Sequence, residues 1–166
     1  MVGTLGILVF GVVMTYIGYS ETVYPLEKAK GYFSRSLSSP SPEIILDYLA
    51  SVKPLIPNEG NPVWVFPTAT TDFGLIHKDI SLIMDRLRLL STLSRDSVAF
   101  NTGLMDVRGE LTTLEEQITT VQPYVFVSFQ NLILSVLWIA IILAIFTFMK
   151  RGKEKAMAYE KMIGGE

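Results

Sequence analysis

Side chains that could perform acid–base or metal chemistry are scarce in this sequence. His77 is the only histidine, and there is no cysteine. Copper and zinc sites usually combine several imidazole, thiolate or carboxylate ligands, so we expect no metal site built by this chain alone. Because His77 follows Ile76 on a predicted helix, we interpret it as a solvated or partner-facing side chain.

Neighbouring carboxylates are the next candidates for chemistry. The pairs Glu115–Glu116 and Glu43–Asp47 could in principle act as general acid and general base, but the sequence offers neither pair an activating neighbour. Solvated helix faces account for both pairs. Other charges are typical of surface ion pairs, each contributing at most about 1 kcal/mol. These charged residues are Asp79, Asp85, Arg86 and Arg88.

Motifs of catalysis and of nucleic-acid binding are absent from the sequence. There is no Gly-rich phosphate loop and no Gly-x-Ser-x-Gly nucleophile motif. The net charge of −2 is too small to imply nucleic acid as a partner. We therefore expect neither catalytic residues nor a cofactor in this chain, and an enzyme that uses carboxylates alone is only a third alternative.

Two apolar segments bracket the rest of the chain and must position it. No charged residue occurs between Met1 and Ser20, and none occurs from Gln117 to Met149. We predict one transmembrane helix in residues 1–20, rising roughly 27 Å over Val2–Tyr19, and a second in residues 123–149. The first segment lacks the basic start and the Ala-x-Ala-like site of a cleaved signal peptide, so we interpret it as a membrane span.

The distribution of charge predicts a two-pass topology in the cell membrane. The tail, residues 150–166, has five basic and three acidic residues, and its basic cluster directly follows the second span. The segment from Glu21 to Glu116 has nine basic and thirteen acidic residues. Since basic residues favour the cytoplasmic side, we expect both termini in the cytoplasm and residues 21–122 in the extracellular or pseudoperiplasmic space. The basic residues that argue the other way are Lys28, Lys30 and Arg35.

The polar middle is predicted to begin with two helices. An apolar series with near-helical spacing follows the first span, which we expect to bend at Pro25 and to continue along the surface. This series is Leu26, Ala29, Phe33 and Leu37. A second helix should start at Ser41-Pro42-Glu43, with the Ser41 hydroxyl as its cap, and end near Val52. A proline-rich loop from Pro54 to Thr71 comes next.

Two apolar series at steps of three and four residues predict an antiparallel helical hairpin in residues 72–122. Asp72 is a plausible cap of its first helix, the polar segment Ser94–Ser97 is its turn, and its second helix should run through Pro123 into the membrane. The fold class is therefore an all-α membrane protein in which two transmembrane helices flank a coiled-coil-like hairpin and a Pro-rich aromatic loop. The two series are Phe73, Ile76, Ile80, Ile83, Leu87 and Leu90, and then Phe100, Leu104, Val107, Leu111, Leu114, Ile118 and Val121.

An aromatic strip in the Pro-rich loop is the first candidate interface. In Asn61–Thr68, prolines bracket an extended apolar run in which Trp64 and Phe66 should point the same way. Two interpretations stay open at this point. The aromatic rings either cover the core of the hairpin or anchor another protein, as large rigid side chains do at interfaces.

A stripe of small and polar residues inside each predicted span is the second candidate interface. Small residues let helices approach closely, and a polar side chain in hydrocarbon needs a hydrogen-bond partner. The two spans can satisfy each other, or a neighbouring membrane subunit can satisfy both. The candidates are Gly11, Thr15 and Gly18 on the first span and Ser128, Asn131 and Ser135 on the second.

Three segments of the chain resemble a known family. Asn61–Thr68, Thr71–Ile76 and Asn101–Gly109 look like segments of small two-span membrane proteins of ammonia-oxidising archaea. From Pro54 to about Phe148 the chain is similar to a small accessory subunit of the archaeal ammonia monooxygenase, a copper membrane monooxygenase. The resemblance implies attachment to that complex, with the copper held by histidines and carboxylates of larger subunits and none by this chain.

The sequence thus predicts a non-catalytic accessory subunit that stabilises a multi-subunit membrane complex through transmembrane and extracytoplasmic contacts. Its expected partners are other integral membrane subunits and lipid. The alternative is a membrane-anchored ectodomain that senses a ligand and acts through a partner. We expect such a receptor to need an output domain, for which the tail after Met149 is short.

Overall fold

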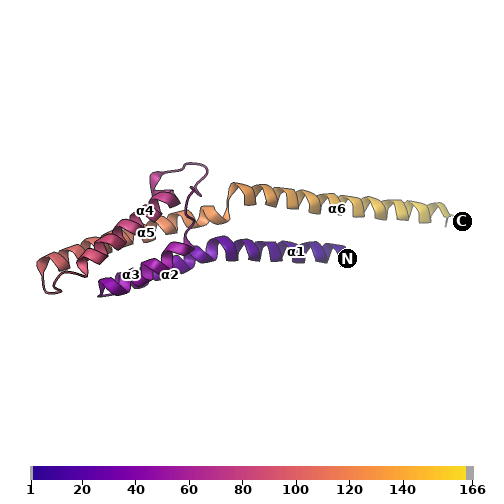
Figure 1. Ribbon diagram of the computed structural model, residues 1–166. Helices are drawn as coiled ribbons and strands as arrows, with labels where there is room; N and C mark the ends of the chain where they lie inside the picture. The colour runs from indigo at the N-terminus through magenta and orange to yellow at the C-terminus, as the bar shows by residue number, and fades with distance from the viewer. Residues whose placement is uncertain (1, 164–166) are drawn as a thin grey trace. The chain divides into compact units, whose positions relative to one another are not determined.

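The computed structural model describes residues 2–163, and its helices are drawn in Figure 1. Within that range no β-strand occurs, so the prediction of an all-α protein is confirmed. Three short turns of helix, η1 (Tyr19–Val23), η2 (Lys53–Leu55) and η3 (Ala69–Thr71), accompany the longer helices. The longer helices are α1 (Val2–Gly18), α2 (Tyr24–Ser38), α3 (Pro42–Val52), α4 (Phe73–Leu90), α5 (Val98–Phe126) and α6 (Phe129–Ile163).

The chain divides into two compact units. Residues 11–128 form one, which we call the bundle unit, and the described residues before Gly11 and after Ser128 form the other. Two helical stretches, one within Leu5–Ser38 and one within Val98–Ile163, are long and apolar enough to cross a membrane. The second predicted span, residues 123–149, falls within the second stretch, and residues 5–20 of the first predicted span fall within the first stretch.

The first helical stretch passes from α1 to α2 through one π-helical turn. The N–H of Tyr24 donates to the carbonyl of Tyr19, five residues back, where an α-helix would bond four residues back. Pro25, which has no N–H to donate, lies in the first turn of α2. The Thr22 hydroxyl donates to the carbonyl of Gly18 at 2.6 Å. Helical backbone therefore runs without interruption from α1 into α2.

Helix α3 starts where the sequence predicts, but its cap differs from the prediction. The helix begins at Pro42, directly after Ser41. The Ser41 hydroxyl donates to the carboxylate of Glu43 and makes no capping hydrogen bond to the backbone. A cap would require the hydroxyl oxygen to accept from an N–H of the first turn, but the hydroxyl is turned toward the Glu43 carboxylate, so the prediction of a hydroxyl cap was wrong.

Four helices, α2 to α5, pack around a common apolar core. Each helix packs on its neighbour in sequence, and α2 also packs on α5, which closes the bundle. Figure 1 shows the α2–α3 and α4–α5 connections at one end of the bundle and the α3–α4 connection at the other. The apolar residues of α4 and α5 that the sequence series predicts are all buried. A hairpin alone would leave one side of these seams in water, and α2 and α3 cover it.

Helix α2 is a wall of the core. Leu26, Ala29 and Phe33 are almost completely buried, so the prediction that this segment runs along a surface was wrong for its apolar face. Phe33 shares the core cluster with residues of α3, including Ile45 and Leu49. An amphipathic helix gains stability by burying its apolar stripe, and α3 and α5 provide the matching surface for α2.

Three polar contacts fix the ends of the bundle helices. The Asp72 side chain accepts from the N–H of Leu75 at 3.0 Å and caps α4, and the Ser97 hydroxyl does the same for α5 by accepting from the N–H of Phe100 at 3.1 Å. Across the bundle, Arg108 of α5 donates to the carbonyl of Ser39, the C-cap residue of α2, at 2.9 Å. A cation at a helix C-terminus is favourable, so Arg108 links α5 to the α2–α3 turn.

Helix α5 does not continue as one helix into the second predicted span. It ends at Phe126, Val127 leaves helical geometry with φ −89° and ψ 50°, and α6 begins at Phe129. Pro123 lies inside α5 and removes one backbone donor just before the break. Helix α6 then continues through the basic segment predicted as a tail.

Substituting a charge into the core should destabilise the bundle strongly. Ile83→Asp or Leu111→Asp would bury an unpaired carboxylate, and we expect the free energy of unfolding to fall by about 3 kcal/mol or more. Thermal unfolding of the full chain in mild detergent, followed by circular dichroism, measures the change. Asp85→Ala is the control, because Asp85 is exposed and pairs with Arg88 of its own helix at 2.5 Å. Equal shifts in all three variants would contradict the assigned core.

Candidate functional site

The His77 side chain makes a hydrogen-bond contact with the backbone of the α3–α4 connection. Its ring Nε2 lies 3.0 Å from the carbonyl oxygen of Ile56 and, in the tautomer with a proton on that nitrogen, donates to it. This bond joins the start of the α3–α4 connection to α4. Among residues 2–163, no group of three or more histidine, aspartate and glutamate side chains lies close enough together to hold a metal ion. His77 is thus engaged with backbone rather than with other candidate ligands.

The paired carboxylates considered for chemistry lie on the surface of the bundle. Glu43 accepts from the Ser41 hydroxyl and lies 3.7 Å from Arg95. The hydrogen bond from Ser41, more than the charge of Arg95, lowers the pKa of Glu43. A general base needs a pKa near the working pH, so this shift makes Glu43 a weaker base.

Arg86 forms its ion pair with Glu110 of α5, which links the two helices of the hairpin.

The connection between α3 and α4 is an ordered loop built around one asparagine. We call residues 56–72 the aromatic loop. The Asn61 side chain donates to the carbonyl of Thr68 at 2.9 Å, and its oxygen accepts from the N–H of Val63 at 3.1 Å and from the Thr71 hydroxyl at 3.0 Å. The N–H of Phe73 donates to the carbonyl of Gly60 at 2.9 Å and closes the loop. Gly60 has φ +100°, a conformation that favours glycine.

The aromatic residues of this loop have different environments. The Trp64 indole N–H donates to the carbonyl oxygen of Val127 at 3.0 Å, in the break that follows α5. Trp64 is nevertheless 44% exposed, and Phe66 is 80% exposed. The side chain of Val63, in the same loop, is buried in the core. The indole N–H of Trp64 thus bonds to its own chain at Val127, outside the predicted hairpin, whereas the Phe66 side chain is exposed. The choice between covering the hairpin core and anchoring another protein stays a prediction.

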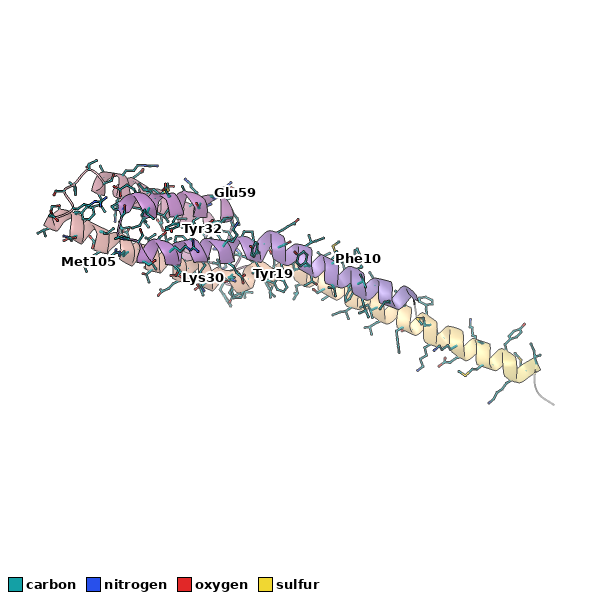
Figure 2. The ribbon with its side chains drawn as sticks, turned by 90° about the horizontal axis from the view of Figure 1, so that it is seen from below. Phe10, Tyr19, Lys30, Tyr32, Glu59 and Met105 are labelled. Atoms are coloured by element: carbon teal, nitrogen blue, oxygen red, sulfur yellow. The ribbon has the colours of Figure 1, made fainter. Side chains whose placement is uncertain are left out.

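A second polar cluster, which the sequence analysis missed, lies at the same end of the bundle. The Tyr19 hydroxyl donates to one carboxylate oxygen of Glu27 at 2.7 Å, and Gln122 of α5 donates to the other at 3.2 Å. Figure 2 labels Tyr19 beside the end of the bundle and Met105 toward the opposite end. Glu27 and Gln122 are far apart in sequence, and no local spacing could have revealed their contact.

The residues of the two predicted stripes are divided between the two units. Asn131 and Ser135 follow Ser128 and lie in the second unit, and the other candidates lie in the bundle unit. Thr15 donates to the carbonyl of Gly11 at 2.8 Å, and Ser135 donates to that of Asn131 at 2.7 Å, so both hydroxyls bond within their own helices. Gly18 accepts from Thr22. Ser128 lies in the break before α6 and therefore does not share a helix face with Asn131 and Ser135, because the backbone at Val127 is not helical. That part of the stripe prediction was wrong.

A groove between α4 and α5 near Gln117 is a further surface feature. It is open to solvent and has a volume of about 310 Å³. Within the described part of the chain, the Gln117 side-chain oxygen is buried without a hydrogen-bond partner. The salt bridge between Arg86 and Glu110 crosses the groove. Its lining includes Asp79, Leu82, Arg86, Glu110, Thr113 and Gln117.

Comparisons with protein-family models, with curated protein sequences and with solved structures find no match to this chain. Its geometry is therefore the basis for a functional proposal. The polar contacts described above hold turns and helix ends together, and in the aromatic loop ordered backbone presents Trp64, Val65 and Phe66 at the surface.

Removing the Asn61 side chain should loosen the aromatic loop. In Asn61→Ala, the N–H of Val63 loses its acceptor and the Thr68 carbonyl loses the Asn61 donor, while the Thr71 hydroxyl keeps the Thr68 carbonyl as an acceptor. We therefore expect amide hydrogen exchange across residues 60–72 to accelerate several-fold. Hydrogen exchange with mass spectrometry on the full chain in detergent measures this. Asn58→Ala is the matched control, since Asn58 is exposed and in the same loop. Unchanged exchange in Asn61→Ala would show that other contacts hold the loop.

Proposed function

We propose that this chain is a non-catalytic, two-span accessory subunit of a larger membrane complex. The observation that carries the proposal is that two stretches of membrane-spanning length bracket one compact polar-surfaced helical bundle. In this arrangement the spans hold the bundle at one face of a bilayer, with both termini in the cytoplasm. The basic residues that follow Met149 support this orientation, because positive charge is retained on the cytoplasmic side.

The roles of the polar side chains support an architectural function. His77 bonds to Ile56, Arg108 to Ser39, and Asn61 to three groups of its own loop. An active site needs titratable groups that converge on a substrate, whereas these groups converge on backbone. Such contacts stabilise a fixed surface, which is what a partner subunit requires.

The resemblance to an accessory subunit of archaeal ammonia monooxygenase identifies a candidate complex. Two of its three segments, Asn61–Thr68 and Thr71–Ile76, lie in the aromatic loop and at the start of α4. On this proposal the chain binds other integral membrane subunits and lipid, and the copper ligands belong to those larger subunits. The chain would then assist ammonia oxidation without contacting ammonia.

A ligand-sensing ectodomain is the second candidate, and the groove between α4 and α5 is the observation that favours it. A volume of about 310 Å³ is at the lower end of small-molecule sites, and the buried oxygen of Gln117 could accept a hydrogen bond from a ligand. Gln117→Leu should abolish ligand binding in this case. It should leave the assembly intact if the chain is an accessory subunit.

The proposed orientation can be tested with single cysteines, because the sequence contains none. Ser97 caps α5, so we place the outer cysteine at the exposed neighbour Asp96. In intact cells, Asp96→Cys should react with a membrane-impermeant thiol reagent, and Met162→Cys should react only after lysis. Lysed cells provide the control for total reactivity. Labelling of Met162→Cys alone would reverse the orientation.

The accessory role predicts a stable association and no resident metal. After gentle detergent extraction, native electrophoresis with mass spectrometry should find the chain with larger membrane subunits. The purified chain should retain no stoichiometric copper, because His77 lacks further imidazole or thiolate partners, while the intact assembly should retain it. One copper per isolated chain, lost in His77→Ala, would contradict the proposal.

A further inference from the structure

The aromatic loop combines exposed apolar side chains with a twelve-residue segment that has no charge. From Gly60 to Thr71 the sequence contains no charged residue, and Glu59 and Asp72 bracket this segment. Phe66 is 80% exposed, and Val65 and Trp64 are each nearly half exposed. A contiguous exposed apolar patch indicates an interaction surface, and its lack of charge favours a weakly polar partner.

The hydrogen bond from Trp64 fixes the position of the loop along the bundle. It ends on Val127, two residues before the start of α6. On the function proposed above, in which α6 spans a bilayer, Val127 lies at the membrane surface. The polar contact between Glu27 and Gln122 lies five residues earlier on α5, or about 7.5 Å along the helix axis at 1.5 Å per residue. Along the chain, Trp64 therefore contacts a residue nearer to the proposed span than Gln122 is.

The loop is also held in shape before it meets any partner. Asn61 and Thr71 tie its two ends together, and Val63 is buried in the core. Ordering a flexible loop on binding would cost conformational entropy, and a loop that is already ordered avoids much of this cost. Phe66 is thus presented outward on a fixed backbone.

We propose that the aromatic loop inserts into the headgroup region of the bilayer surface from which α6 emerges. Trp and Tyr prefer this region because an apolar ring and a polar N–H or O–H are both satisfied there. Trp64 has this character, and Phe66 extends the apolar contact toward the acyl chains. A bilayer is favoured over a protein partner because Trp64 bonds to Val127, two residues before the proposed span, and because residues 60–71 carry no charge that would select a protein surface.

Spin labels on the full chain test the depth of the loop. Single cysteines at Phe66, at Met105 and at Val136 would carry a nitroxide in vesicles of phosphatidylcholine and phosphatidylglycerol. Met105 is exposed toward the other end of the bundle, as Figure 2 shows, and Val136 is exposed on α6. Collision with oxygen reports lipid, and collision with a water-soluble nickel complex reports solvent. We expect the oxygen-to-nickel ratio at position 66 to exceed that at 105 several-fold and to stay below that at 136.

Three results would overturn the insertion. A ratio at position 66 equal to that at 105 would place the loop in water. A label at 66 shielded from both reagents would indicate contact with protein, such as a second copy of this chain. A low ratio at position 136 would show that α6 is not in lipid, which contradicts the proposed function itself and so is distinguished from a failure of the loop alone.

A second measurement uses Trp64 as its own reporter. In the Trp138→Phe background Trp64 is the only tryptophan, and we expect phosphatidylcholine brominated on its acyl chains to quench its emission. Phe66→Asp should reduce this quenching, because a carboxylate resists entry into the headgroup–acyl boundary. Phe66 is too exposed for the substitution to unfold the bundle. Quenching by aqueous acrylamide alone would contradict the insertion.

Discussion

The hydrogen bond between the Trp64 indole and the carbonyl of Val127 is the contact on which this end of the bundle depends. A helix that stops leaves carbonyl groups without intrahelical partners, and such groups are costly wherever water is scarce. Helix α5 stops at Phe126, directly before the most apolar part of the chain. A donor from a loop more than sixty residues earlier in the sequence satisfies one of these carbonyls, and the same bond fixes where the loop lies.

The bundle behind this contact is stabilised mainly by its apolar core. Residues from α2 to α5, and Ile56 and Val63 of the aromatic loop, belong to one buried cluster. Polar contacts then select the arrangement of the connections, as Arg108 does for the α2–α3 turn and Asn61 for the aromatic loop. This division of roles is typical of small helical domains: burial of apolar surface provides the stability, and a few hydrogen bonds select one arrangement of the connections.

Periodic features were predictable from the sequence, and contacts between distant segments were not. Steps of three and four residues identified the buried positions of α4 and α5, because a helix face repeats locally. The apolar series of α2 was recognised, but its burial depends on α3 and α5, which its own spacing does not encode. The break at Val127 and the bond from Trp64 depend on backbone geometry and on a partner far away in sequence. The same holds for the contact of Glu27 with Gln122.

The π-helical turn Tyr19–Val23 has a consequence for the rotation of α1. One π turn accommodates one residue more than an α turn, and one residue corresponds to about 100° around a helix axis. The face that carries Gly11 and Thr15 is therefore offset, relative to the face that buries Leu26 and Phe33, from where an unbroken α-helix would place it. Loss or gain of a single residue in this turn would rotate the upstream face by about a quarter of a circle while the core stayed in register. The turn thus lies between α2, which must fit the core, and α1, whose exposed face could be turned toward other neighbours without a change in the core.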